Sequence, residues 1–132
     1  MPVVIDSSYA MALVLPDEQA PATAADVLAS ELIAPFLFPV EVANAALNSI
    51  RRKRYGTDEA QRVCDAIESL SVSVLPGPDV IPTQRLRQAQ AFGLSVYDAL
   101  YLDLALTQRA TLATCDLALA DAARRVGVQV LS

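Results

Sequence analysis

The chain has 132 residues, a length that suits one domain, and 54% of them are hydrophobic, enough to bury a substantial core. It contains no histidine and two cysteines, which excludes Ser-His-Asp hydrolases, histidine-based ribonucleases, four-thiolate zinc sites and a disulfide framework. The net charge of −5 argues against an ordinary basic nucleic-acid binder and suits an acidic site that recruits a cation. General chemistry must therefore depend on carboxylates, hydroxyls, arginines or the single lysine, Lys53.

The segment that begins the chain, MPVVIDSSYA, lacks the basic region and apolar stretch of a secretory signal. No apolar run reaches the roughly 18 residues that a membrane helix needs. We therefore expect one domain over residues 1–132, in a reducing cytoplasm and without contact to a membrane.

Short β-branched or apolar runs predict strands, and apolar residues at helical spacing predict helices. Strands are expected at 2–6, 32–35, 71–76, 110–115 and 128–132. Helices are expected at 7–15, 16–31, 40–54 and 57–70, before Phe92, from Ser95, and at 116–126, with a loop at 77–82. Gly56 suits a left-handed cap after the long helix, and Gly93 ends a later one. Because strands alternate with helices and no tight hairpin is indicated, the sequence predicts a three-layer α/β/α fold with a mostly parallel sheet of four to five strands.

Four acids share one kind of local position, at the C-terminal end of a strand or the N-terminal end of a helix: Asp6, Glu41, Asp98 and Asp116. Each alone is accounted for by helix capping and the helix dipole, and Ser95 followed by Asp98 resembles a capping box. In a parallel α/β sheet, however, these ends gather along one edge, where ligands bind. Four converging carboxylates repel one another unless a cation joins them, and an oxygen-only set suits Mg²⁺ or Mn²⁺.

Asp103 is expected to play a different part. It lies five residues beyond Asp98, about 140° around a helix that turns about 100° per residue. It cannot share the face of Asp98, and we expect it to be solvated or locally paired.

Two further polar residues, Thr114 and Asn44, each have a functional and a structural interpretation that are about equally well supported. Thr114 precedes Asp116 by two residues, so both face one side if the strand continues through them, and its hydroxyl would then suit a metal-bound water. Strand propensity explains Thr114 equally well. Asn44, about one turn beyond Glu41, either orients that carboxylate or is simply exposed.

The motifs VVIDSS, PVEVANAAL, SVYDALYLDLA and LATCD, in this order, resemble the PIN-domain ribonucleases, in particular the VapC-type toxins of toxin–antitoxin pairs. The resemblance covers nearly the whole chain. It implies a PIN-like fold and a Mg²⁺-dependent endoribonuclease that cleaves RNA phosphodiester bonds with metal-activated water. It also implies an antitoxin partner and a homodimer. The implied acidic set is Asp6, Glu41, Asp98 and Asp116, and the implied supporting residues are Ser7, Asn44 and Thr114.

Cations gather at the end of the long helix, at Arg51, Arg52, Lys53 and Arg54. They are either a track for an RNA backbone or residues that favour the helix dipole and solubility. Tyr97 and Tyr101, four residues apart, are expected on one helix face, in the core or at a dimer interface.

Two other functions remain open from the sequence. A phosphatase or phosphoacceptor domain with an acidic pocket is one, although an aspartyl-phosphate phosphatase needs a second acid where Ser8 stands, and a receiver-like domain needs a lysine at a late strand end. A catalytically silent protein-binding module is the other, and the complete acidic set argues against it.

Overall fold

The computed structural model describes residues 1–77 and 81–132. Five strands form one parallel sheet in the order β3-β2-β1-β4-β5. They are β1 (Val3–Ile5), β2 (Leu32–Pro35), β3 (Ser73–Leu75), β4 (Thr111–Ala113) and β5 (Val130–Leu131). The predicted parallel α/β architecture is therefore confirmed.

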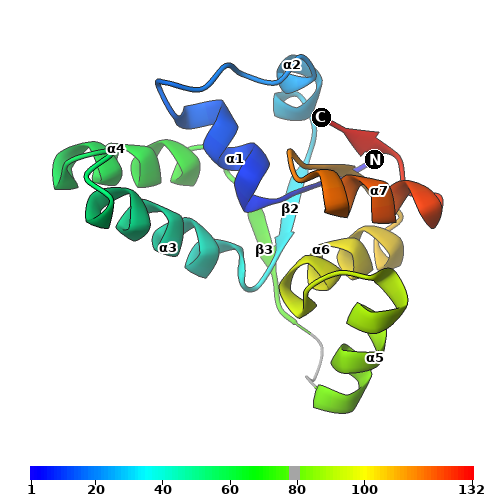
Figure 1. The fold of residues 1–132 in the computed structure, drawn as a ribbon. Helices are drawn as coiled ribbons and strands as arrows, with labels where there is room; N and C mark the ends of the chain where they lie inside the picture. The colour runs from blue at the N-terminus through cyan, green and yellow to red at the C-terminus, as the bar shows by residue number, and fades with distance from the viewer. Residues whose placement is uncertain (78–80) are drawn as a thin grey trace.

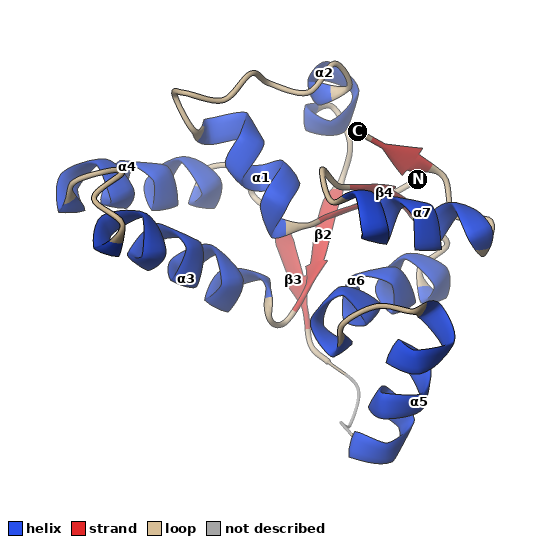
Figure 2. Ribbon diagram, viewed as in Figure 1, coloured by secondary structure: helices blue, strands red, loops and turns tan. Residues whose placement is uncertain are grey.

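The helices form two layers, one on each face of the sheet (Figures 1 and 2). The chain moves along the sheet in one direction from β1 to β3 and in the other from β3 to β5, and right-handed crossovers then place the two groups of helices on opposite faces. One group packs together as α1, α3 and α4, and the other as α5, α6 and α7. The bounds of the helices are α1 (Ser7–Val14), α2 (Ala24–Leu28), α3 (Phe38–Arg51), α4 (Thr57–Glu68), α5 (Pro82–Phe92), α6 (Val96–Thr107) and α7 (Leu117–Arg125).

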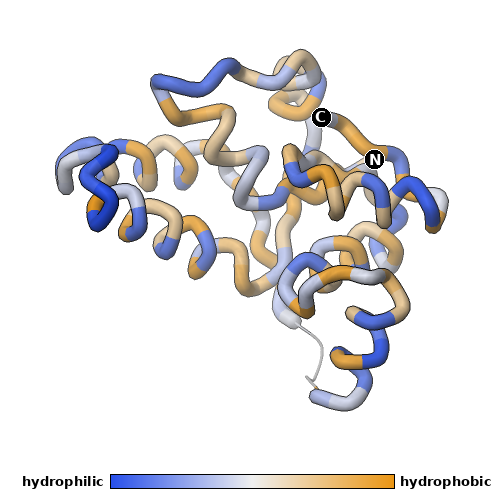
Figure 3. Tube along the Cα trace, viewed as in Figure 1, coloured by the Kyte–Doolittle hydropathy of each residue, from blue (hydrophilic) through white to orange (hydrophobic). Residues whose placement is uncertain are grey.

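The core lies where the central strands meet helix α6, which packs against β1, β2 and β4. Val4 and Ile5 of β1 and Leu112 of β4 are completely buried, as are Tyr9 of α1 and Leu102 of α6. A strand covered on both faces needs apolar residues at successive positions, which explains the unbroken run VVI in β1. Hydrophobic and hydrophilic residues are mapped along the chain in Figure 3.

The predicted second helix is mostly wrong. Of residues 16–31, only α2 is α-helical, and the chain between Leu15 and Pro21 has no helix. Pro21 has no backbone N–H and disfavours helical geometry at the residue before it, so the apolar pattern of this segment could not continue as one helix.

The end of α3 also differs from the prediction. The left-handed residue is Lys53, with φ 57°, whereas Gly56 has φ −76° and begins α4 as its N-cap. The N–H of Arg54 donates to the Ser49 carbonyl at 2.9 Å and that of Lys53 to the Ile50 carbonyl at 2.9 Å, which is the Schellman pattern. These two bonds close the helix at Arg51, so Arg52 to Arg54 lie beyond it. The prediction for Gly93 is confirmed, with φ 68° at the end of α5.

The loop predicted at 77–82 lies partly outside the described residues, because nothing is described for 78–80. Pro82, at its end, is the first residue of α5. In residues 1–77 and 81–132, no helix combines the length and the apolar character that crossing a membrane requires.

Candidate active site

The direction of the chain along the sheet reverses between β1 and β4, which are neighbours. Ligands of open parallel sheets bind at such a switch point, outside the carboxyl ends of the strands. Asp6 follows β1 directly, and its N–H donates to the Ala113 carbonyl of β4 at 3.2 Å. Thr114 and Asp116 follow β4, so three of the residues predicted for the site lie at this point.

Asp6 is buried, at 5% exposed, and hydrogen bonds hold its carboxylate in one position. Its Oδ1 accepts from the Ser8 hydroxyl at 2.7 Å and from the Tyr9 N–H at 2.9 Å, and its Oδ2 accepts from the Thr114 hydroxyl at 2.5 Å. Burial raises the pKa of Asp6, the three hydrogen bonds oppose this effect, and the negative charge of Asp116 adds to it. The same carboxylate serves as the N-cap of α1, so capping and a place in the site are not alternatives here.

Thr114 joins Asp6 to Asp116. Its side chain is completely buried, and its hydroxyl donates to Asp6 while it accepts the N–H of Asp116 at 3.0 Å. The strand does not continue through these residues, since β4 ends at Ala113, so the geometry assumed in the prediction is wrong. Because the Thr114 hydroxyl donates its proton to Asp6, its role is to position Asp6 and Asp116 by hydrogen bonding.

Ser8, next to the Ser7 that the resemblance implied as a supporting residue, contacts Asp6. Its hydroxyl donates to Asp6 and accepts the N–H of Cys115 at 3.1 Å, which ties α1 to the segment after β4. Ser7 shows no side-chain hydrogen bond to any described residue. The sequence could have predicted this contact, because the first turn of a helix directs the side chain two positions after an N-cap aspartate back toward the cap.

Glu41 and Asp98 come from the first turns of α3 and α6. Burial raises the pKa of both carboxyls most; the charges of Asp98 and Asp6 raise that of Glu41 further, and those of Asp116 and Asp6 raise that of Asp98. The charges of Asp6, Asp98 and Asp116 thus act on neighbouring acids of the predicted set, which places the four in one electrostatic environment. We call Asp6, Glu41, Asp98 and Asp116 the acidic cluster.

Tyr101 is a further residue of this site, and the sequence interpretation missed its role. It is 1% exposed, and its hydroxyl donates to Oε1 of Glu41 at 2.6 Å. Burial and the hydrogen bond to Glu41 raise the pKa of Tyr101, which keeps the proton on the hydroxyl. A tyrosine one helical turn beyond Asp98 was the signal, because a buried tyrosine hydroxyl normally finds a partner.

The acidic cluster is not a closed metal cage. Within the described residues, no three Asp, Glu, His or Cys side chains are arranged so that they could hold one metal ion. Mg²⁺ usually keeps several water molecules and binds through one or two carboxylates, so it does not need such a cage. The oxygen-only donors and the mutual repulsion of the carboxyls fit a divalent cation.

Three further residues singled out in the sequence are Asn44, Asp103 and Tyr97. Asn44 is exposed and makes no hydrogen bond to Glu41. Asp103 pairs with Arg85, with 3.4 Å between Nη1 and Oδ2, as expected for a locally paired acid. Tyr97 is 64% exposed whereas Tyr101 is buried, so the two tyrosines do not form one surface.

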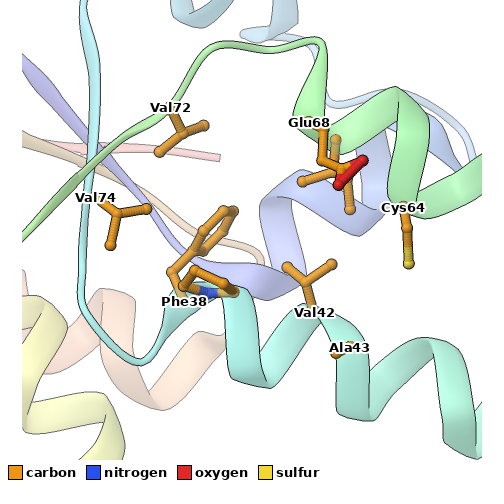
Figure 4. A pocket seen from close by; sticks show the side chains of 9 residues that line it. Phe38, Val42, Ala43, Cys64, Glu68, Val72 and Val74 are labelled. Atoms are coloured by element: carbon orange, nitrogen blue, oxygen red, sulfur yellow. The ribbon is translucent and has the colours of Figure 1, made fainter.

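A pocket of about 350 Å³ is mostly apolar, and no residue of the acidic cluster lines it. It lies between α3, α4 and the strand segment that carries Val72 and Val74, and Glu68 and Cys64 lie on its α4 side (Figure 4). Glu68 and Cys64 are its titratable lining residues, and both come from α4, whereas the acidic cluster brings acids of four chain segments to the switch point; the acidic cluster is therefore the candidate active site.

The model of the PIN domain matches residues 3–125. The chain belongs to the PIN-domain family. It is 32% identical over 119 residues to VapC ribonuclease Mb0985 of Mycobacterium bovis and to ribonuclease VapC9 of Mycobacterium tuberculosis, which covers 90% of this chain and 89% of each relative. The resemblance inferred from the four motifs is confirmed.

Solved structures agree with the PIN assignment. PAE2754 from Pyrobaculum aerophilum has 25% sequence identity and a TM-score of 0.75, over 98% of this chain and 83% of that one. FitAcB from Neisseria gonorrhoeae shares the fold at a TM-score of 0.68 and 15% identity, over 98% of this chain and 96% of that one.

Removing the Thr114 hydroxyl should destabilise this PIN domain. Thr114→Val keeps the shape of the side chain but leaves Oδ2 of Asp6 and the N–H of Asp116 without their partner, at a cost of about 1–3 kcal/mol. Urea unfolding measures the loss. Thr114→Ser keeps the hydroxyl and should lose less, and an equal loss in both variants would show that packing, not the hydrogen bonds, is responsible.

Neutralising Asp98 should stabilise the metal-free PIN domain. The folded pKa of Asp98 is raised, so its ionisation opposes folding as the pH rises above its ordinary value of 3.8. Asp98→Asn should therefore melt a few degrees higher at pH 7 in EDTA, and the difference should shrink as the pH falls toward 3.8. Asp103→Asn on the same helix loses an ion pair instead and should not melt higher. A gain that is independent of pH would contradict the role of charge repulsion.

Proposed function

We propose that this PIN domain is a Mg²⁺-dependent endoribonuclease and the toxin of a toxin–antitoxin pair. The observation that carries the proposal is the electrostatic coupling of the acidic cluster at the switch point of a chain whose relatives are named VapC ribonucleases. These relatives support a nuclease, and we add to it the dependence on metal.

The residues of the acidic cluster are proposed to hold Mg²⁺, or Mn²⁺, at the sheet edge. When bound, such an ion lowers the pKa of water and neutralises a phosphate. Asp6 already accepts three hydrogen bonds, out of about four that a carboxylate can accept, so it offers roughly one further position, on Oδ2. A cation held there would relieve the repulsion of Asp6 with Asp116 and Asp98.

Glu41, Asp98 and Asp116 differ from Asp6 in how they are held. Tyr101 donates one hydrogen bond to Glu41, which fixes the direction of that carboxylate. Asp116 accepts the N–H of Leu119 through Oδ1 at 3.0 Å, which leaves Oδ2 for a ligand. At the start of α6 the N–H of Asp98 donates to the Ser95 hydroxyl at 3.1 Å, so this capping bond does not use the carboxylate oxygens of Asp98, which we assign to the cation.

The family relationship favours the nuclease over the two alternatives left open by the sequence. A phosphatase of the aspartyl-phosphate type needs a second acid two residues after Asp6, whereas Ser8 stands there and donates its hydroxyl to Asp6. A silent binding module gives no reason to retain carboxyls that destabilise the fold by repelling one another.

Two charge-neutral substitutions test the proposed mechanism. Asp6→Asn and Asp98→Asn keep the shape of the side chain while they remove a ligand and a charge, so both should fold and lose RNA cleavage by at least about 100-fold, on the scale of several kcal/mol of lost electrostatic stabilisation. Cleavage of a single-stranded RNA in Mg²⁺ is measured, and EDTA should abolish it in the wild type.

Asp103→Asn is the matched control, since Asp103 lies on the same helix as Asp98 and pairs with Arg85. It should retain most activity. Cleavage by Asp6→Asn at the wild-type rate, with a contaminating nuclease excluded, would end the mechanism.

The partners proposed are RNA, an antitoxin and a second copy of the chain. Tyr101 is buried and contributes no surface, whereas Tyr97, at 64% exposed, and Val40 of α3, at 70%, offer surface for a dimer. We expect light scattering to give the mass of a dimer.

We also expect the product of an adjoining small reading frame to co-purify and to inhibit cleavage by placing an arginine against the acidic cluster, because arginine pairs with carboxylates bidentately. A monomer at all concentrations would contradict the dimer, and an antitoxin that leaves cleavage unchanged would contradict the inhibition.

A further inference from the structure

A groove of about 440 Å³ lies between α1 and α3 and connects the surroundings of Asp6 with the cations after α3. Ser8 and Cys115 line one end, and the Ser8 hydroxyl there donates to Asp6. Arg52 and Arg54 line the other end, with Asn48 and Ser49 of α3 between them. From Ala45 to Arg52, the groove follows α3 for roughly 10 Å at about 1.5 Å per residue.

The charges of the groove differ from those of the whole chain. Two arginines and one acid, Glu18, line it, whereas the chain carries a net charge of −5. Of the four neighbouring cations, Arg51 and Lys53 are exposed but are not among the described residues that line the groove. The structure thus divides the cation run into two members that face the groove and two that do not.

Arg54 is occupied by two acids of the segment after α1. Its Nη2 lies 2.7 Å from Oδ2 of Asp17 and 3.7 Å from Oε1 of Glu18, and its guanidinium lies 5.2 Å from the centre of the Tyr55 ring. The side chains of Arg54 and Asp17 are 44% and 51% exposed. Exposed ion pairs of this kind contribute little to stability and exchange readily for another anion.

We propose that this groove holds the RNA strand next to the bond that is cleaved, and that Arg54 exchanges Asp17 for an RNA phosphate. The inference rests on the proposed ribonuclease function and adds to it the path of the substrate. The planar guanidinium of Arg54 already donates through both Nε and Nη2 to Asp17, and the same fork fits two oxygens of a phosphate. Arg52 supplies a second cation, while Asn48 and Ser49 offer polar groups along the path.

The first experiment measures the binding of a fluorescein-labelled single-stranded RNA of mixed sequence, by anisotropy in EDTA, so that cleavage does not enter. Arg52→Gln and Arg54→Gln should each weaken binding about threefold to tenfold and lower the salt slope by about 1. Arg51→Gln and Lys53→Asn are the matched controls, with the same change of charge in the same segment. Asparagine is chosen at Lys53 because it tolerates the positive φ there. Both controls should change binding less than about twofold.

The second experiment tests the exchange at Arg54. Asp17→Asn should tighten RNA binding about twofold to fivefold, as expected when an exposed competing ion pair is removed, and should have no effect in the Arg54→Gln protein. Asp121→Asn makes the same change of charge at an ion pair on α7, where Arg124 lies 3.6 Å away, and should not tighten binding to the same extent.

The outcomes separate the groove from the proposed function. Equal weakening by all four cation substitutions, or equal effects of Asp17→Asn and Asp121→Asn, overturns the groove, because net charge alone would then explain binding. Wild-type RNA cleavage together with unchanged RNA binding by Arg52→Gln and Arg54→Gln overturns the groove and leaves the ribonuclease standing. A wild-type protein that neither binds nor cleaves RNA overturns both.

Discussion

The hydrogen bond from the Thr114 hydroxyl to the buried Asp6 carboxylate joins the ends of the two central strands, at the point where the chain reverses its direction along the sheet. The same hydroxyl accepts the N–H of Asp116, so it also sets where α7 begins. Two helices therefore start from one network, since Asp6 caps α1 and Asp116 caps α7. Capping stabilises the fold, and the same geometry brings two carboxylates to one edge of the sheet.

The site combines this stabilisation with repulsion. A buried ionised carboxylate is costly without hydrogen bonds, and Asp6 has three. These bonds do not remove the effects of burial and of neighbouring acids, because the pKa values of Asp6, Glu41 and Asp98 stay raised. The fold thus holds like charges closer together than stability alone favours, which is expected where a cation and a phosphate are to be bound.

Local sequence patterns predicted the strands, most helices and the positions of the acids, because these depend on residues within a few positions of one another. Local patterns could not predict contacts between residues that are far apart in the sequence. Tyr101 reaches Glu41 across 60 residues, and Thr114 reaches Asp6 across 108, so spacing along the chain could suggest polar residues but not their partners. The end of α3 failed for a related reason: hydrogen bonds to Ser49 and Ile50 fix the left-handed residue at Lys53, although a glycine stands three positions later.

Helix α3 connects the acidic cluster to the groove and sets the distance between them. Glu41 lies in its first turn, and Arg52 follows its last residue, about 16 Å further along the axis at about 1.5 Å per residue. Because a helix packed against α1 and α4 is rigid over this length, the separation of the acids from the cations is fixed. A small phosphorylated molecule bound at the acids does not extend to Arg52, whereas a polynucleotide does. The geometry therefore favours the proposed polynucleotide substrate over a small phosphate ester, since only the longer substrate gains binding energy from both ends of the helix.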